Sequence, residues 1–275
     1  ISGTATGAAA GDKVTVTIGG QTYTTVLDAA GNWSVGVPAS VISGLSDGTV
    51  TVTASVTDAA GNTGTGSHNV TVDTGLPSVS FNAISDDNVL NAVEKGQDLR
   101  VSGTSANLAE GTVVAVTLNG KNYTATTAAD GTWSLTVPAA DLAGLGQANY
   151  TLNATATNGV GNSVSNTANL LVDTALPTVT INTVAGDNVI NAAEVAAGQT
   201  LSGKVTNAEA GNTVTVTIGG NTYTATVQSD LTWSVNVPES VLTALGNGDL
   251  TVSATVTNGH GNTGTGEREI AIDAN

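Results

Sequence analysis

The sequence repeats itself with a period of 100 residues, and this limits its architecture more than any other feature. The three tryptophans are Trp33, Trp133 and Trp233. A tyrosine, a proline, a Gly-Asn pair and an aspartate recur in the same register, at 23, 38, 61–62 and 73 and again 100 and 200 residues later. The period exceeds the roughly 20–45 residues of stacked solenoid units. Each copy is therefore predicted to be a small domain with its own core.

The register divides the chain into predicted domains at 1–74, 75–174 and 175–275. The tripeptide at 1–3 aligns with 101–103, so the first domain lacks the counterpart of 76–100, which holds a first strand and an acidic loop. Proline restricts its own backbone and that of the residue before it. The joints at 73–77 and 173–177 both end in Leu-Pro, and we expect them to be stiffer than Gly/Ser linkers.

Strand signals are clearest in the second domain, at 78–83, 99–105, 112–119, 122–127, 132–137, 149–157 and 163–172. Apolar residues alternate with Thr and Ser there, as at Val114, Val116 and Leu118. This period of two is typical of half-buried antiparallel strands. Asn119-Gly120 supplies a two-residue hairpin turn. The chain is rich in Thr, Val and Asn and has 34 glycines, a composition that predicts strands and turns without helix.

Seven strands in about 100 residues predict an all-β fold of tandem immunoglobulin-like β-sandwich domains, arranged as an elongated rod. Each tryptophan shares a face with apolar neighbours, which indicates a core anchor. A sugar-stacking platform is the alternative role. Phe81 and Tyr150 are the only aromatic residues outside the Trp and Tyr registers.

The charge balance narrows the range of partners. Six basic and 22 acidic residues give a net charge of −16. Phosphate binding needs clustered Lys and Arg, so nucleic acid and anionic lipid are excluded, whereas metal ions and basic proteins remain. Cysteine is absent, which excludes disulfides and thiolate sites. The chain begins Ile-Ser-Gly without a signal peptide and has no apolar run of about 18 residues, which predicts no membrane insertion. It is expected to be a monomer.

One acidic loop gathers side-chain oxygens in an otherwise charge-poor protein. Asp86, Asp87, Asn91 and Glu94 lie within nine residues of the second domain. The third domain carries four such side chains in the same register, at Asp187, Asn188, Asn191 and Glu194. Calcium takes six to eight oxygen ligands, so this loop is a candidate calcium site. The alternative is a helical turn in which the Asn caps and the Glu closes a capping box.

Three more aspartates are candidate calcium ligands. Asp73 and Asp173 stand where a strand leaves one domain for the next, and Asp58 begins a Gly-Asn loop in which Asn158 and Asn258 take its place. Turn formation is the alternative role for all three. Glu110 and Glu209 are weaker candidates. Acidic residues near the tryptophans are interpreted as hairpin turn residues, namely Asp28, Asp130 and Asp230.

Signals for an enzyme are weak. The segment 44–48 fits the Gly-x-Ser-x-Gly nucleophile pattern, which requires a preceding strand and a following helix, but a strand is predicted after it. His68 and His260 do not recur in the other domains, so neither a catalytic triad nor a histidine zinc site is indicated. The chain is predicted not to be an enzyme.

Four motifs in fixed order resemble the bacterial Ig-like repeats of giant, non-fimbrial surface adhesins. In the third domain they are Val-Asp-Thr-x-Leu-Pro at 172–177, the acidic loop at 186–194, Trp-Ser-x-x-Val-Pro at 233–238 and Thr-Asn-x-x-Gly-Asn at 257–262. The resemblance covers the whole chain. It implies an extracellular virulence protein at the bacterial surface, exported by type I secretion, with Ca²⁺ at or near the domain junctions.

Together these observations predict a calcium-stiffened stalk segment that extends a distal binding region toward host cells. Its expected partners are calcium ions and the neighbouring Ig-like repeats of the same chain. The alternative is that the repeats themselves bind a host glycan or protein receptor. That function would need an exposed apolar or aromatic patch.

Overall fold

The structure, a computed structural model, describes all of residues 1–275. The chain divides into two compact units, Ile1–Pro77 with Thr157–Ser163 and Ser78–Ala156 with Val164–Asn275. Buried apolar residues form three separate cores, one within each of 1–74, 75–174 and 175–275, which we call the first, second and third repeats. The domain boundaries at 74/75 and 174/175 remain predictions.

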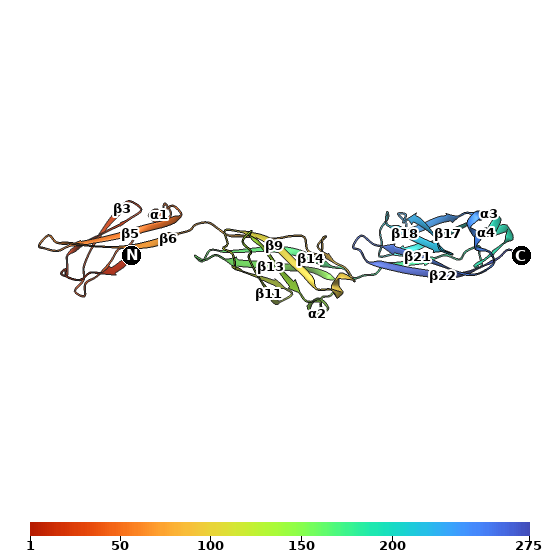
Figure 1. The fold of residues 1–275 in the computed structure, drawn as a ribbon, viewed down its shortest axis with the longest axis horizontal. Helices are drawn as coiled ribbons and strands as arrows, with labels where there is room; N and C mark the ends of the chain where they lie inside the picture. Colours follow the sequence, from red (N-terminus) through yellow and green to blue (C-terminus); the bar gives the residue numbers. More distant parts are fainter. The chain divides into compact units, whose positions relative to one another are not determined.

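The third repeat is a sandwich of two sheets around its core (Figure 1). The smaller sheet has the strand order β15-β17-β20 and the larger the order β16-β22-β21-β18-β19. The strands are β15 (Thr178–Ile181), β16 (Val189–Asn191), β17 (Gln199–Thr206), β18 (Thr213–Ile218), β19 (Asn221–Thr226), β20 (Thr232–Val237), β21 (Gly248–Thr257) and β22 (Thr263–Asp273). The helices are α3 (Ala192–Ala197) and α4 (Glu239–Leu245).

The second repeat has the same architecture, with sheets β12-β9-β7 and β11-β10-β13-β14-β8. Its strands are β7 (Ser78–Phe81), β8 (Val89–Leu90), β9 (Leu99–Ala106), β10 (Val113–Leu118), β11 (Lys121–Thr126), β12 (Thr132–Val137), β13 (Ala148–Thr157) and β14 (Ser163–Val172). A 3-10 turn η1 (Glu94–Gly96) and a helix α2 (Ala139–Leu142) complete it.

The first repeat is smaller. Its sheets are β1-β4 and β3-β2-β5-β6. The strands are β1 (Ser2–Thr4), β2 (Lys13–Ile18), β3 (Gln21–Val26), β4 (Asn32–Ser34), β5 (Gly48–Thr57) and β6 (Thr63–Val72), with one helix α1 (Ala39–Ile42). As the alignment predicts, no strand corresponding to β7 or β15 is present in this repeat.

The structure confirms that the apolar residues of the alternating strands form the cores. Val114, Val116 and Leu118 point inward from β10 and are at most 2% exposed. Trp133 and Trp233 are 2% and 1% exposed, which confirms them as core anchors. The all-β, immunoglobulin-like sandwich follows from this burial of alternate residues on facing sheets.

The predicted hairpin turn is also confirmed. Leu118 pairs with Lys121, which leaves Asn119 and Gly120 as the two-residue loop. Both have positive φ, 48° and 77°, as the turn that matches the twist of the two strands requires.

The short helices and the strands β8 and β16 are departures from the predicted elements. Helices α1, α2 and α4 each follow a proline, at Pro38, Pro138 and Pro238. Proline fixes φ in a way that suits a helix start. Leu142 and Leu242 are fully buried, so packing against the sandwich overrides the weak helix propensity of the composition.

Candidate functional site

The acidic loop of the second repeat lies next to the joint with the third. β8 pairs in parallel with the end of β14, with Leu90 opposite Val172. The backbone N–H of Asp173 donates to the carbonyl of Leu90 at 3.1 Å. The loop 86–94 is therefore held beside the residue at which the chain leaves the repeat.

Within the loop, the capping interpretation is confirmed. In the third repeat the Asn191 side chain accepts from the backbone N–H of Glu194, and the Glu194 carboxylate accepts from that of Asn191. The second repeat has the same pair of hydrogen bonds, because Asn91 Oδ1 accepts from Glu94 N at 3.0 Å and Glu94 Oε2 accepts from Asn91 N at 3.0 Å. Such reciprocal bonds satisfy the free N–H groups that begin a helical turn.

The remaining polar residues of the loop shape its backbone. Asp86 has φ of 61° and its counterpart Gly186 has φ of 90°. Glycine adopts this left-handed conformation without strain, which explains the replacement. Asn88 and Asn188 also have positive φ, and each accepts a hydrogen bond from the backbone four residues earlier.

Asp87 and Asp187 form local turns in the same loops. Each carboxylate accepts from the backbone N–H two residues later at 2.9 Å. This is the turn chemistry expected of aspartate.

At the second joint, hydrogen bonds connect the second and third repeats. Asn262 Nδ2 donates to the carbonyl of Asp173 at 2.8 Å, and Asn262 Oδ1 accepts from the N–H of Ala92 at 2.8 Å. Asn262 is only 1% exposed. His260 Nδ1 lies 2.6 Å from Asp173 Oδ2, and Ala175 N donates to Asp173 Oδ1. The hydrogen bond from His260, followed by that from Ala175, lowers the pKa of the Asp173 carboxyl.

The corresponding contacts in the first compact unit are weaker. Asp73 Oδ1 accepts from Gly75 N at 3.0 Å, and Asn158 Nδ2 reaches Asp73 Oδ2 at 3.4 Å. Asn162 Nδ2 donates to the carbonyl of Asp73 at 3.1 Å. The Oδ2 atom of Asp73 therefore has the neutral amide of Asn158 as its partner, whereas Oδ2 of Asp173 has the imidazole of His260.

Asp58 is a turn residue in the structure. Its carboxylate accepts from the side chain and backbone of Asn62 and from Ala60 N, and these bonds, that of the Asn62 side chain first, lower its pKa. Asn158 and Asn258 use their amide oxygens in the same way. The hairpin interpretation is likewise confirmed for the carboxylates that accept turn N–H groups beside the tryptophans, at Asp28, Asp130 and Asp230.

Solved structures of two adhesins align with the whole chain. One is described as a Ca²⁺-stabilized adhesin that helps an Antarctic bacterium reach out and bind ice; it is 37% identical, with 100% of this chain and 68% of that chain covered and a TM-score of 0.52. The other, from a 1.5-MDa bacterial ice-binding adhesin, is 33% identical over 100% of this chain and 90% of that chain, with a TM-score of 0.51. The family profile described as bacterial Ig-like domain matches residues 2–74. This chain belongs to the bacterial Ig-like domains of large adhesins. No curated protein sequence matches it significantly.

In this bacterial Ig-like chain, no three His, Asp or Glu side chains converge into a group that would hold a metal ion. Both carboxylate oxygens of Asp173 face nitrogen atoms, those of Ala175 and His260. Calcium requires several oxygen ligands on one ion. The residues at Asp173 therefore do not fit calcium in this arrangement.

The acidic loop of the second repeat is more open to a cation. Asp86, Glu94 and Asp98 line one hollow, together with Arg100. No hydrogen bond is made to the carboxylate of Asp86, and only one oxygen of Glu94 accepts one. Arg100 forms no ion pair with these carboxylates.

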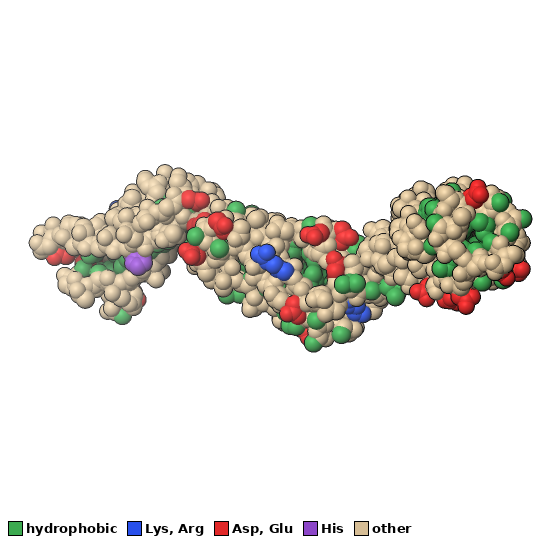
Figure 2. Space-filling view, turned by 45° about the vertical axis from the view of Figure 1, so that its right-hand side comes forward, with side chains coloured by type: hydrophobic (Ala, Val, Ile, Leu, Met, Phe, Trp, Pro, Cys, Tyr) green, Lys and Arg blue, Asp and Glu red, His purple; other side chains and the backbone are tan.

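Figure 2 shows carboxylates scattered over the viewed face of this bacterial Ig-like chain, with only a few Lys and Arg side chains between them. None of the helices is long and apolar enough to cross a membrane. The segment 44–48, which fits the nucleophile pattern, lies between α1 and β5, an order opposite to the strand-then-helix arrangement that such a nucleophile requires.

Two residues of the joint, His260 and Asn262, are not among the residues that the sequence predicts for the site. His260 does not recur in the other repeats, and that difference within a repeated loop is the one signal in the sequence of a contact specific to this joint. Asn262 recurs in all three repeats, and nothing in its register distinguishes a turn residue from one that bridges two repeats.

Proposed function

We propose that this chain is a segment of the extended stalk of a giant bacterial surface adhesin, which holds a distal binding region away from the cell. The observation that carries the proposal is the full-length match to repeats of two large adhesins at 37% and 33% identity. A series of small domains, each with its own core, lengthens a stalk by the length of one domain for about every 100 residues. Strands of eight to ten residues at about 3.4 Å per residue, plus loops, give roughly 35–45 Å per sandwich.

Small-angle scattering tests this function. A tandem fusion of two copies of residues 1–275 is expected to have close to twice the maximum dimension of one copy. A fusion that is no longer than a single copy would show that the repeats fold back on one another, and the stalk function would be rejected.

Calcium stiffening is a second, separable part of the proposal. It is supported by the description of one relative as Ca²⁺-stabilized and by the incompletely hydrogen-bonded carboxylates of Asp86 and Glu94. Extracellular modules bind calcium at about 10⁻⁴–10⁻³ M, which millimolar calcium would saturate in large part.

A calcium titration followed by thermal unfolding tests the calcium site. We expect calcium to raise the melting temperature of the wild type, and Asp86→Asn with Glu94→Gln to reduce that rise. Glu239→Gln, on helix α4, is the matched control and should leave it unchanged. A wild type that shows no response to calcium or to a chelator would reject calcium stiffening and leave the stalk function standing.

The same proposal places the protein outside the cell, at the bacterial surface, with type I secretion as the export route. Neighbouring Ig-like repeats are its structural partners. If the repeats themselves bound a host glycan or protein, the isolated chain would adhere to host cells. We expect no such adhesion, and saturable binding of labelled chain to cells would replace the stalk by a receptor function.

A further inference from the structure

The joint between the second and third repeats presents nitrogen donors to the carboxylate of Asp173. His260 Nδ1 lies 2.6 Å from Asp173 Oδ2, and the backbone N–H of Ala175 donates to Oδ1 of the same side chain at 3.0 Å. An ionised carboxylate only accepts hydrogen bonds, so the hydrogen between the imidazole and Asp173 is carried by Nδ1. Both oxygens of this carboxylate are therefore already used.

Asn262 ties the two repeats together from the same loop as His260. Its Nδ2 donates to the main-chain carbonyl of Asp173 at 2.8 Å, and its Oδ1 accepts from the N–H of Ala92 at 2.8 Å. The Asn262 side chain is only 1% exposed. Turning the amide over to offer its oxygen to a cation would set Nδ2 against the Ala92 N–H and leave that group without an acceptor, which is costly away from water.

The other two amides at the joint also have their oxygens occupied. Asn258 Oδ1 accepts from two backbone N–H groups of its own loop, at 3.1 and 3.0 Å. Asn91 Oδ1 accepts from two backbone N–H groups of the acidic loop, so its Nδ2 is the end that approaches the third repeat. A Cβ on Gly261 would lie 3.0 Å from that nitrogen. Calcium requires several oxygen atoms directed at one ion, and these side chains direct their oxygens elsewhere.

The imidazole is specific to this joint. Valine occupies the register position of His260 in the second repeat, at Val160. Asp73 accordingly has no ring as a partner, and its Oδ2 meets only the amide of Asn158 at 3.4 Å. On Asp173, by contrast, the imidazole N–H occupies the oxygen that a cation would need.

We infer that the joint between the second and third repeats is held by a calcium-independent latch, in which His260 and Asn262 of the third repeat bind Asp173 of the second. The imidazole N–H takes the position of a cation on the carboxylate. The inference concerns this joint alone and does not depend on whether calcium binds at Asp86 and Glu94. In a stalk, such a joint would keep its geometry when calcium is withdrawn.

Spin labels across the joint test the latch. The chain has no cysteine, so two introduced cysteines are the only sites of labelling. Thr124→Cys and Thr224→Cys place one label at an exposed position of β11 and one at an exposed position of β19. Double electron–electron resonance on the complete chain then gives the distribution of distances between the two repeats. We expect this labelled parent to give one narrow distribution, identical in calcium and in chelator.

Substitutions of His260 identify the group that holds the joint. His260→Val introduces the residue of the second repeat, which cannot donate, and we expect the narrow distribution to be lost in chelator. His260→Asn keeps a side-chain N–H close to the position of Nδ1 and should restore the narrow distribution. His68→Val, at the other histidine of the chain, is the matched control and should behave as the labelled parent does. Circular dichroism shows whether each variant is folded.

The latch is overturned if the labelled parent gives a broad distribution in chelator, if His260→Val stays narrow there, or if His260→Asn is as broad as His260→Val. The first of these results needs no substitution of the joint, so the inference remains falsifiable even if a variant fails to fold. It is also independent of the calcium titration proposed above. A melting temperature that responds to calcium through Asp86 and Glu94 is compatible with a joint that does not respond.

Discussion

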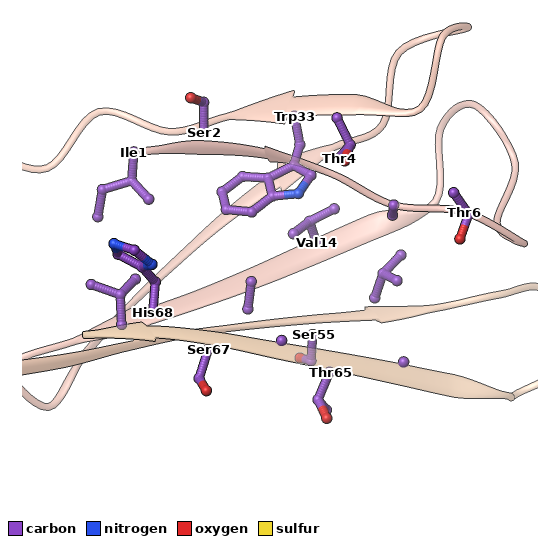
Figure 3. A pocket seen from close by; sticks show the side chains of 16 residues that line it. Ile1, Ser2, Thr4, Thr6, Val14, Trp33, Ser55, Thr65, Ser67 and His68 are labelled. Atoms are coloured by element: carbon purple, nitrogen blue, oxygen red, sulfur yellow. The ribbon is translucent and has the colours of Figure 1, made fainter. Parts of the chain in front are cut away.

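At the scale of single residues, the three tryptophans occupy one register but meet different surroundings. Trp133 is 2% exposed, packs edge-on against Phe81 with ring centroids 5.4 Å apart, and donates from Nε1 to the carbonyl of Thr104 at 3.3 Å. Trp233 is 1% exposed, and its buried Nε1 has no partner. Trp33 is only half-buried, because its ring borders a cavity of the first repeat that residues of β1, β5 and β6 also line (Figure 3). The same side chain therefore contributes differently to each core.

Substitution of Trp133 by alanine is expected to lower the free energy of unfolding of the second repeat by about 3–5 kcal/mol, as for large core aromatics. Trp33→Ala is the matched comparison and should cost the first repeat clearly less, since its ring is already partly hydrated. Denaturant unfolding followed by circular dichroism measures both. Equal losses would show that the indole of the first repeat is as well packed as that of the second.

Tyr123 provides a prediction of pH dependence. Burial first, and then the hydrogen bond to Asp141 at 2.8 Å and its charge, raise the Tyr123 pKa to about 12. A tyrosine whose pKa is raised on folding adds stability below its unfolded pKa of 10.0, and that stability is lost as the pH rises through the folded value. Asp141→Asn removes the charge, so the Tyr123 pKa should fall toward 10, while burial keeps it above that value.

The measurement is a tyrosinate absorbance titration in a background in which the other three tyrosines are phenylalanine. Lys121→Ala is the control, because it removes the other partner of Asp141 and leaves the phenol hydrogen bond in place. An Asp141→Asn titration that coincides with the wild type would show that burial alone sets the pKa.

At the scale of elements, one loop has two roles. The Gly-Asn loop between β21 and β22 closes its own hairpin through Asn258, whose side chain accepts from Asn262 N. The side chain of Asn262 is thereby free to bond the second repeat at Asp173 and Ala92. In the first repeat, the equivalent Asn62 bonds only Asp58 within its own turn. The Gly-Asn loop is therefore only a hairpin turn in the first repeat, whereas in the third repeat it also connects to the second repeat.

Asn262→Ala is expected to speed hydrogen exchange at the Ala92 amide, because that partly buried N–H loses its acceptor. Leaving such a group unsatisfied costs about 1–3 kcal/mol. Asn62→Ala, which removes no contact outside its own turn, should leave exchange at Ala92 unchanged. If Ala92 remains as protected in Asn262→Ala as in the wild type, the bond is not what holds the acidic loop to the third repeat.

The strands were predictable because alternation is a local property: 132–137 and 163–172 match β12 and β14 from end to end. The two-residue strand β8 is too short to show a period and forms only because β14 lies beside it.

The candidate site was predictable in part. The position of loop 86–94 beside Asp173 follows from the topology, whereas the use of its oxygens as caps and turns depends on φ values and N–H directions that the sequence does not display.

At the scale of the whole molecule, the repeats differ in the size of their cores. The first buries five apolar residues, whereas the second and third bury 19 and 21. Hydrophobic stabilisation is roughly proportional to the apolar area removed from water. In the chain of residues 1–275, the three repeats should therefore not unfold as one cooperative unit, and the first should unfold earliest.

A single tryptophan in each repeat makes this order measurable. In Trp133→Phe with Trp233→Phe, only Trp33 reports, and its fluorescence should change at lower denaturant than that of Trp233 in Trp33→Phe with Trp133→Phe. Since replacement of a tryptophan affects the repeat that loses it, each reporter stays in an unmodified core. Coincident transitions would indicate that the repeats stabilise one another across their joints.

The parallel pairing of β8 with β14, and of β16 with β22, has a mechanical consequence. Tension applied to the two ends of a repeat draws the entering and the leaving segments in opposite directions along a shared axis. The hydrogen bonds between them, such as those around Leu90 and Val172, then carry the load together in shear instead of opening one by one as at the end of a hairpin. Under a steady pull, the second and third repeats should therefore each resist until the paired segments separate together.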